Sequence, residues 1–441
     1  MLVSVLFAAC SPAPEAEVGA PTWHADVAPI LVARCAGCHV EGGIAPFALD
    51  SQASAAAMAD AASAAVQAGT MPPFDAYETE DCTPTLGWQD DPRLTDEEKD
   101  TLAAWAEAGA PEGDPATAAG LPSPVVSELA GATAELAPEE SYTTAGSQDE
   151  FMCVSIDAGL TTDAWFSGLE VLPGNERVVH HVVVVSDPHA ETAAWGSAYR
   201  SCFQLPAITD SQALAVWVPG SPPTELPESS GIPLAAGARL VMQLHYHPAG
   251  EVAEPDLTRL RIATGPTAPE WQAILFGLGN FATEAEGLQP GPGDRSETEF
   301  RIPKNVPDHT ETEIFTTEAG ETDFYFFSVQ PHLHMVGTDM QIRWQREEPR
   351  QSEAEDECLL QSRWRFEWQR SYTYAAERII DLPRGRGGDT LWMQCRYDNT
   401  LDNPGVRRAL ADAGLDEPVN VELGEGSLDE MCIGIFGAVY R

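Results

Sequence analysis

Three short apolar stretches carry more than half of the ten histidines of this chain. They contain His180 and His181, then His245 and His247, then His332 and His334. Each stretch is rich in β-branched or alternating apolar residues, which predicts a β-strand. Because side chains alternate faces along a strand, His332 and His334 point the same way and can bind one metal ion. These strands are therefore the first place to expect metal chemistry.

The histidine doublet poses a geometric question. Neighbours in a strand face opposite sides, so His180 and His181 can share a metal only if the strand is bulged or ends there. The alternative is one core histidine and one surface histidine. His247 shares a face with His245 and is expected close to the metal without binding it. Two further histidines lie in polar segments and are expected to be solvated, namely His189 and His309.

A second kind of chemistry is indicated near the N-terminus, where Cys35, Cys38 and His39 form the string Cys-Ala-Gly-Cys-His. This string is typical of c-type haem attachment, in which two thiols bond to the vinyl groups and the histidine binds the iron. The alternatives are a zinc site and a chance occurrence. The residues around the string predict helices at 26–34, 51–68 and 95–108, so the expected module is a small helical domain that resembles a class I cytochrome c.

The second axial ligand of such a haem is expected to be Met71. Two prolines follow it and hold it in an extended segment with its thioether free, and a thioether raises the potential of a c-type haem. His24 is the competing ligand. Met58 lies inside a predicted helix and is assigned to packing.

The composition limits the partners. The chain has 441 residues, with 24 Lys and Arg against 69 Asp and Glu, which gives a formal net charge of −45. Nucleic acids and anionic lipid surfaces would be repelled, so no nucleic-acid partner is expected. The acidity itself predicts a solvated surface.

The length predicts several domains: a small all-α cytochrome c-like module followed by two all-β sandwiches of jelly-roll-like type. After residue 135 the sequence consists of short β-rich runs separated by Gly, Pro, Asp and Asn. The expected boundaries are 1–19 for a signal and tether, 20–115 for the haem module, 116–134 for a linker, 135–285 for the first sandwich and 286–441 for the second.

Cysteine use and the N-terminus predict export. The apolar run at residues 2–9 ends at Cys10 and resembles the lipobox of a bacterial lipoprotein, although it is short and no Lys or Arg precedes it. We therefore expect a periplasmic or cell-envelope protein whose only membrane contact is a lipid on Cys10. The six cysteines outside Cys10 and the haem string suggest up to three disulfides, with their pairing left open.

Four motifs in order carry a family resemblance. They are the His-His strand, Gln243-Leu-His-Tyr246, His332-Leu-His334, and Asp429-Glu-Met-Cys432. Together they resemble the copper type II, ascorbate-dependent monooxygenases, the family of peptidylglycine hydroxylating and dopamine β-monooxygenases. The resemblance extends from Phe151 to the C-terminus, about 290 residues.

The resemblance implies two copper sites. One copper would be bound by His180, His181 and His245, and the oxygen-binding copper by His332, His334 and Met431. From spacing alone Met431 would be assigned to the core. Its soft thioether favours Cu(I), the state that meets O₂.

The resemblance also implies disulfides between Cys153 and Cys202 and between Cys395 and Cys432. Cys82 and Cys358 are left over. If they pair, they would link the haem module to the β-rich body; otherwise they are two free thiols.

The expected function is that of a copper-dependent monooxygenase that hydroxylates a C–H bond of a small-molecule substrate with O₂. Electrons would arrive through the fused haem, from a redox partner protein or from ascorbate. Gln330 and Ile433–Ile435 stand where peptide-hydroxylating relatives place an Arg and a Tyr that bind a carboxylate, so a peptidylglycine substrate is not expected. The alternatives are a non-catalytic electron-transfer or copper-handling lipoprotein, and a structural β-protein whose histidines are all core.

Overall fold

A computed structural model describes residues 19–41, 45–121, 128–145, 149–202, 205–219, 221–247, 252–280, 287–318, 320, 322–366, 368–424, 426 and 428–441. The chain divides into two compact units. The smaller unit consists of Met1–Pro72 and Arg93–Val125, and the larger unit consists of Pro73–Pro92 and Val126–Arg441. The chain therefore passes between the two units three times.

The regular elements in the described residues of the smaller unit are helical. They are η1 (Trp23–Val27), α1 (Ala28–Arg34), α2 (Gln52–Ala57), α3 (Ala59–Gln67), α4 (Asp96–Glu107) and η2 (Pro115–Thr117). The start of α4 is fixed by a capping box, in which the Glu98 backbone N–H donates to Thr95 Oγ1 at 3.2 Å and the Thr95 N–H donates to Glu98 Oε2 at 2.8 Å. Trp105 on α4 is 2% exposed and packs beside Trp23, so the buried faces of α4 and η1 share one core.

The larger unit is built from β-sheets, which confirms the β-rich body expected from the sequence. Its largest sheet contains, in spatial order, β1 (Ala134–Leu136), β12 (Arg259–Gly265), β4 (Ala164–Leu172), β9 (Ser230–Leu234), β13 (Trp271–Gly279), β23 (Ile433–Tyr440), β16 (Phe324–His332) and β19 (Tyr372–Thr373), with β8 (Thr224–Glu225) beside β4 and β20 (Arg384–Gly385) beside β16.

Two further sheets accompany it. One contains β6 (Arg200–Ser201), β3 (Glu150–Asp157), β10 (Arg239–Tyr246), β5 (Val179–Asp187) and β7 (Ala213–Trp217), and the other β15 (His309–Thr316), β21 (Thr390–Tyr397), β17 (Gly337–Gln345) and β18 (Asp356–Arg363). The remaining elements are the pairs β2 (Tyr142–Thr143) with β11 (Pro255–Asp256) and β14 (Arg301–Ile302) with β22 (Val421–Glu422), and the helices η3 (Glu191–Trp195), η4 (Ile379–Asp381) and α5 (Pro404–Asp412).

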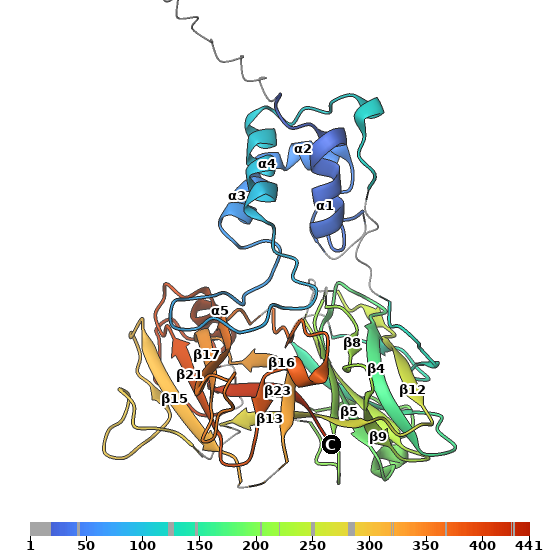
Figure 1. Ribbon diagram of the computed structural model, residues 1–441, viewed down its shortest axis with the longest axis vertical. Coiled ribbons are helices and arrows are strands. Elements are labelled where there is room, and N and C mark those ends of the chain that lie inside the picture. Colours follow the sequence, from blue (N-terminus) through green and yellow to red (C-terminus); the bar gives the residue numbers. More distant parts are fainter. Residues whose placement is uncertain are drawn as a thin grey trace, which may run out of the picture. The chain divides into compact units, whose positions relative to one another are not determined.

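The largest sheet passes through both of the expected sandwich ranges. β13, from the first range, pairs from Gln272 to Gly279 with β23 at the end of the second range. The link from β13 back to the first range is short, a parallel pairing of Trp271 and Gln272 with Ser230 and Gly231. Figure 1 shows β13, β23 and β16 side by side between the green strands of the first range and the orange strands of the second. The two ranges therefore share one continuous sheet.

Residues 73–92, which we call the strap, belong to the larger unit, although they lie within the range 20–115 expected for the haem module. The strap is attached to the second range along most of its length. Ala76 forms a β-bridge with Ser362, and Trp88 forms one with Tyr374. The strap therefore extends the β-rich body.

Three disulfides join Cys82 to Cys358, Cys153 to Cys202, and Cys395 to Cys432. Both pairs that the resemblance implies are present, and Cys82 and Cys358, whose pairing was left open, are bonded as well. The three bonds indicate an oxidising compartment. Because Cys82 lies on the strap, the first of these bonds holds the strap to β18 within the larger unit. In the described part of the chain, no helix is long and apolar enough to cross a membrane.

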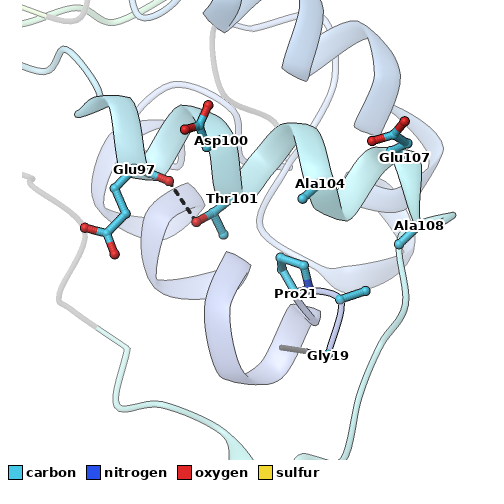
Figure 2. A pocket seen from close by; sticks show the side chains of 9 residues that line it. Gly19, Pro21, Glu97, Asp100, Thr101, Ala104, Glu107 and Ala108 are labelled. Carbon is cyan, nitrogen blue, oxygen red and sulfur yellow. Dashed lines mark hydrogen bonds between the residues drawn. The ribbon is translucent and has the colours of Figure 1, made fainter. Parts of the chain in front are cut away.

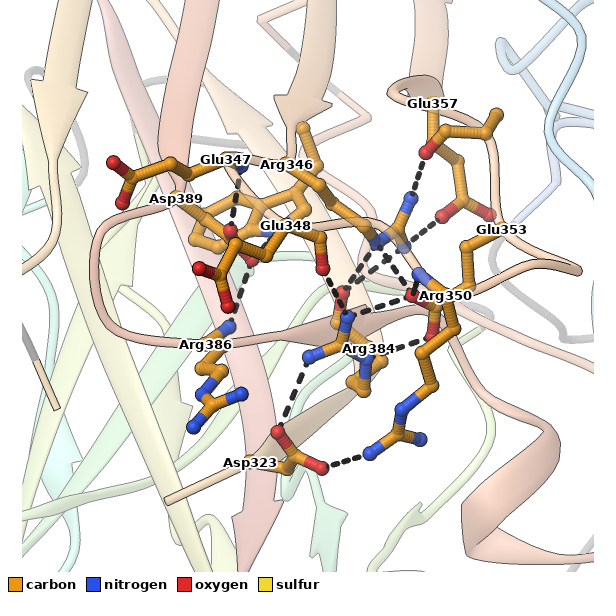
Figure 3. Close-up of polar contacts among 12 residues, drawn as sticks. Asp323, Arg346, Glu347, Glu348, Arg350, Glu353, Glu357, Arg384, Arg386 and Asp389 are labelled. Carbon is orange, nitrogen blue, oxygen red and sulfur yellow. Dashed lines mark hydrogen bonds and ion pairs between the residues drawn. The ribbon is translucent and has the colours of Figure 1, made fainter. Parts of the chain in front are cut away.

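Two buried arginines of the second range, Arg346 and Arg384, form a network of ion pairs and hydrogen bonds (Figure 3). Arg384 donates to both carboxylate oxygens of Glu353, at 2.7 and 2.6 Å, and to Asp323 at 3.1 Å. Arg346 donates to the carboxylate of Glu357 and to the carbonyl oxygen of Arg384. The hydrogen bonds from Arg384 lower the pKa of Glu353 to about 2. Each buried cation therefore has an anionic partner, as the low-dielectric interior requires.

Candidate metal centres

His180, His181 and His245 come together because β5 contains a bulge. In the ladder between β5 and β10, His181 pairs with His245 and Val179 pairs with Tyr246, which leaves His180 as the extra residue. An extra residue breaks the alternation of faces, so two neighbouring side chains can point the same way. The structure thus removes the geometric objection to the doublet.

The three Nδ1 atoms of this histidine trio form a nearly equilateral triangle. His180 Nδ1 lies 3.4 Å from His181 Nδ1 and 3.1 Å from His245 Nδ1, and the third side measures 3.3 Å. Three nitrogens bound to one ion at about 2.0–2.1 Å would lie about 3.3 Å apart in a tetrahedral arrangement and about 3.5 Å apart in a trigonal one. The triangle therefore fits a single metal ion with a position left open.

Among the residues that the structure describes, this trio is the group of three His, Cys, Asp or Glu side chains whose ligand atoms all lie within 4.8 Å of one another. Burial, together with the neighbouring His245, lowers the pKa of His180 to about 3 and that of His181 well below its ordinary value. Both rings are therefore neutral at neutral pH, which is the state in which imidazole binds a metal.

The outer side of the trio faces a carboxylate. Asp149 Oδ1 lies 3.5 Å from His245 Nε2 and 2.6 Å from His247 Nδ1. Asp149 can therefore orient the ring of His245 from the side opposite to the metal position. His247 lies beside the trio and contacts this carboxylate, as its expected place near the metal requires.

The second candidate centre lies where β16 ends. The rings of His332 and His334 have centroids 5.5 Å apart and are nearly perpendicular. His332 Nδ1 donates to Gln369 Oε1 at 3.1 Å, and His334 Nδ1 donates to the carbonyl oxygen of Asp429 at 3.1 Å. With both Nδ1 atoms engaged, both Nε2 atoms keep a lone pair for a metal.

Glu430 brings Met431 to the same place. Its Oε2 accepts the backbone N–H groups of His334 at 2.7 Å and of Met431 at 3.1 Å, so the two backbones lie side by side. Its Oε1 accepts the N–H groups of Val336 and Gly337 at 2.7 and 3.0 Å. This fully buried carboxylate therefore holds the turn after His334 against Met431.

Two further bonds fix the segment that carries Met431, which lies just before β23. Tyr397 Oη donates to the Met431 carbonyl oxygen at 2.8 Å, and Cys432 is bonded to Cys395 on β21. Met431 is 4% exposed. Two imidazoles and a thioether make a donor set suited to copper, because a soft sulfur ligand favours Cu(I).

Burial, followed by the neighbouring His334, lowers the pKa of His332 to about 3, so this ring is also neutral at neutral pH. His332 contributes to the lowered pKa of His181. The trio and the His332–His334 pair therefore lie within electrostatic reach of each other.

In the smaller unit, Cys35 and Cys38 are half-buried cysteines that follow α1 and form no disulfide. The next residue, His39, donates from Nδ1 to the carbonyl oxygen of Phe47 at 3.0 Å, which leaves its Nε2 available to an iron. Burial raises the pKa of the Cys35 thiol to about 12. Met71 is 37% exposed, so its thioether is not committed to the core.

Other sequence predictions have different outcomes. The expectation that His309 is solvated is wrong: it begins β15, is 2% exposed, and its Nε2 lies 2.6 Å from Glu311 Oε1. The prediction failed because the polar residues around it are themselves buried. His189 is exposed, as expected, and pairs with Asp210. The proposed lipid attachment site, Cys10, lies outside the described residues.

A separate hollow of about 750 Å³ lies on the outer face of α4 (Figure 2). Its lining contains none of the residues expected to hold a haem or a metal, and consists of Gly19, Ala20, Pro21, Glu97, Asp100, Thr101, Ala104, Glu107 and Ala108.

Sequence reasoning missed three residues that support the candidate centres: Asp149, Gln369 and Glu430. Glu430 belongs to a quoted motif, but a motif does not show which backbone N–H groups its carboxylate accepts. Asp149 and Gln369 lie 96 and 37 residues from the histidines they contact. Only the fold places them there.

Comparisons with known proteins add little. No protein-family model and no curated protein matches the sequence. Similar solved structures include a peptide-N(4)-(N-acetyl-beta-D-glucosaminyl) asparagine amidase, 9% identical over 70% of this chain and 96% of that one, with a TM-score of 0.25. Others are an allantoicase (11% identical, 56% and 78% covered, TM-score 0.16) and broad bean stain virus (7%, 70% and 89%, 0.22). With TM-scores this low, these likenesses carry no argument about the chain.

Proposed function

We propose that the chain is an exported copper-dependent monooxygenase that hydroxylates a C–H bond of a small molecule with O₂. The observation that carries the proposal is the convergence of two distinct metal-ligand sets in the larger unit. One is an all-imidazole trio with a 3.1–3.4 Å nitrogen triangle. The other consists of His332 and His334, with their Nε2 atoms free, and Met431, whose backbone Glu430 holds beside that of His334. These two sets correspond to the ligand sets implied by the resemblance to the copper type II monooxygenases, and two of the three disulfides are the ones it implies.

The ligand types divide the work between the two sites. Copper at His332, His334 and Met431 would supply the chemistry of O₂ activation, because the thioether favours the reduced ion. Copper at the trio would store the second electron, since imidazole serves both oxidation states. The protein's own residues surround these ligands: Asp149 Oδ1 lies 3.5 Å from His245 Nε2, and Glu430 accepts the backbone N–H groups of His334 and Met431.

A c-type haem on the smaller unit would supply electrons to the copper sites. Cys35 and Cys38 would attach it, and His39 and Met71 would bind its iron. The hydrogen bond from His39 Nδ1 to Phe47 supports this assignment, because it orients the ring and leaves Nε2 free. In this proposal the helical unit is cytochrome c-like, the β-rich ranges are jelly-roll-like, Cys10 carries a lipid anchor, and ascorbate or a redox protein reduces the chain.

Copper stoichiometry tests the proposal directly. The full-length protein should bind two copper ions per chain. His245→Ala and Met431→Ala should each lower this to one tightly bound ion. His247→Ala is the matched control, because His247 neighbours the trio without joining it, and it should keep two. O₂ uptake with ascorbate and candidate substrates should disappear in Met431→Ala while the haem spectrum stays unchanged. A wild-type protein that binds no copper refutes the proposal.

A further inference from the structure

One loop of the larger unit contacts both candidate metal centres. It connects β18 to β19 and contains Trp364, Phe366 and Gln369. Trp364 Nε1 donates to the carbonyl oxygen of His334 at 2.8 Å. Phe366 stacks on His180, with ring centroids 6.1 Å apart and planes 19° apart. The loop thus touches the trio through one side chain and the His332–His334 pair through others.

Gln369 lies at the centre of this arrangement. Its side chain is 6% exposed, and both ends of its amide are used. Nε2 donates to the carbonyl oxygen of Phe366 at 3.2 Å, so the amide oxygen must face the other way. That oxygen, Oε1, accepts the proton of His332 Nδ1 at 3.1 Å. One amide therefore joins a metal-site histidine to the residue that stacks on His180.

The loop is fixed from two sides. Arg365 donates from Nε to both oxygens of Asp75 on the strap, at 3.0 and 2.9 Å, and Asp75 is 5% exposed. From the opposite side, Gln330 Nε2 lies 3.5 Å from the carbonyl oxygen of Gln369, close enough for a weak hydrogen bond. Gln330 stands where peptide-hydroxylating relatives place a carboxylate-binding Arg, so here that position supports the loop.

We propose that Gln369 is a positioning residue that fixes the ring orientation and the protonated nitrogen of His332, and that through Phe366 it couples the His332–His334 pair to the histidine trio. Metal binding at one centre then changes the metal affinity of the other. The inference rests on the proposed function only in taking copper as the metal.

The physical reason is the path of contacts. A metal at the trio fixes the ring of His180, which fixes the stacked ring of Phe366. The carbonyl of Phe366 then holds the Gln369 amide in the orientation that His332 needs. Ordering one member of this path lowers the entropy that the other site must lose on binding its own metal, which gives positive coupling. Coupling between sites is reciprocal, so it can be measured from either side.

The first test needs no metal. In the metal-free full-length protein labelled with ¹⁵N-histidine, His332 should carry its proton on Nδ1. Gln369→Met keeps the length of the side chain and removes both hydrogen bonds, so His332 should shift toward the Nε2-protonated tautomer. Gln369→Glu keeps an acceptor for Nδ1–H and should retain the wild-type tautomer. An unchanged His332 spectrum in Gln369→Met overturns the positioning role, whatever the protein does with copper.

The second test measures affinities by copper titration with an electron paramagnetic resonance readout. Gln369→Met should weaken copper binding at the His332–His334 pair by about 10- to 100-fold, a typical effect of removing a hydrogen bond to a ligand. The affinity of the trio serves as the internal control for correct folding and should change much less. Equal affinities at the pair in Gln369→Met and wild type contradict the proposal.

The coupling itself is measured by comparing copper affinity at the pair with the trio filled, in wild type, and with the trio disabled, in His245→Ala. The ratio should be about 5-fold or larger, within the usual range of coupling between sites. The same comparison is then made with Phe366→Leu present in both proteins, a change that keeps the backbone carbonyl and removes the ring. There the ratio should be near one. A ratio near one in wild type, or an unchanged ratio with Phe366→Leu, rejects the link. If wild type binds no copper, the proposed function fails while the tautomer result still decides the role of Gln369.

Discussion

Glu313 is a fully buried carboxyl group on β15 whose two oxygens have no hydrogen-bond partner among the described residues. Burial, together with the nearby charge of Glu311, raises its pKa from 4.5 to about 9. At a pH between these two pKa values, Glu313 keeps its proton in the folded protein and has released it in the unfolded chain. Stability is therefore highest below the unfolded pKa and falls as the pH rises toward the folded one.

Glu313→Gln resembles the protonated side chain. We therefore expect this variant not to lose stability through this group as the pH rises. The wild-type free energy of unfolding should fall, relative to the variant, by up to about 1.4 kcal/mol per pH unit between about pH 5 and pH 8. Urea unfolding of both proteins across this range measures the difference, and other titrating groups cancel in the comparison. Parallel curves for the two proteins would show that Glu313 is ionised in the fold.

Among single residues, the sequence alone was enough to propose those whose side-chain type already limits what they can bind. Imidazoles, thiols and a thioether are metal or haem ligands by their nature, so His180, His245 and Met431 could be proposed from motifs. Glu430 and Gln369 could not, because a carboxylate or an amide takes its role from the groups that the fold places around it. His309 failed for the same reason: its acidic neighbour is buried with it.

Among the elements, the bulge in β5 and the strap show what a pattern can and cannot reveal. The apolar run around the doublet predicted a strand, and alternation then raised the need for a bulge at His180. The strap gave no such signal. Its residues fall within the range 20–115 expected for the haem module, whereas pairing of Ala76 and Trp88 with Ser362 and Tyr374 attaches it to the larger unit.

The disulfide between the strap and β18 should contribute strongly to stability, because it closes a loop of 276 residues. Replacing Cys82 and Cys358 by Ser should lower the free energy of unfolding of the larger unit by about 2–4 kcal/mol. The strap should also become sensitive to limited proteolysis.

Serine at Cys153 and Cys202 is the matched control, since that bond spans only 49 residues. In the chain-entropy description, removing this bond should lower the free energy of unfolding by about 1.5 kcal/mol less than removing the bond between Cys82 and Cys358. Equal losses for the two pairs, with the strap still protected from protease, would show that the other strap contacts suffice.

Over the whole molecule the dominant property is charge. A net charge of −45 at neutral pH makes the folded chain repel itself, and salt screens that repulsion. Raising NaCl from about 10 mM to about 1 M shortens the screening length from about 30 Å to about 3 Å. The melting temperature should rise by at least about 3 °C, equivalent to about 1 kcal/mol.

Calorimetry in NaCl and in KCl checks this prediction, and both salts should act alike because screening depends on ionic strength. A melting temperature that falls with salt would mean that attractive ion pairs, such as those of Arg384, outweigh the general repulsion.

The pattern of short β-rich runs and the cysteine count also predicted the broad architecture, a β-rich body with up to three disulfides. It did not predict the continuous sheet. Pairing of β13 with β23 joins residues more than 150 positions apart, and no local pattern encodes a partner at that distance.

Because the chain passes between its two units three times, the larger unit cannot be expressed intact as one continuous C-terminal fragment. A fragment that starts after residue 125 would omit the strap, so Cys358 would keep a lone thiol and the aromatic rings of Tyr372 and Tyr374 would lose the Phe74 and Trp88 rings that cover them. Arg365, at the base of the loop between the two histidine sites, would lose Asp75. The β-rich half is better isolated by replacing residues 1–72 and bridging 93–125 with a flexible linker, because that design keeps every one of these contacts.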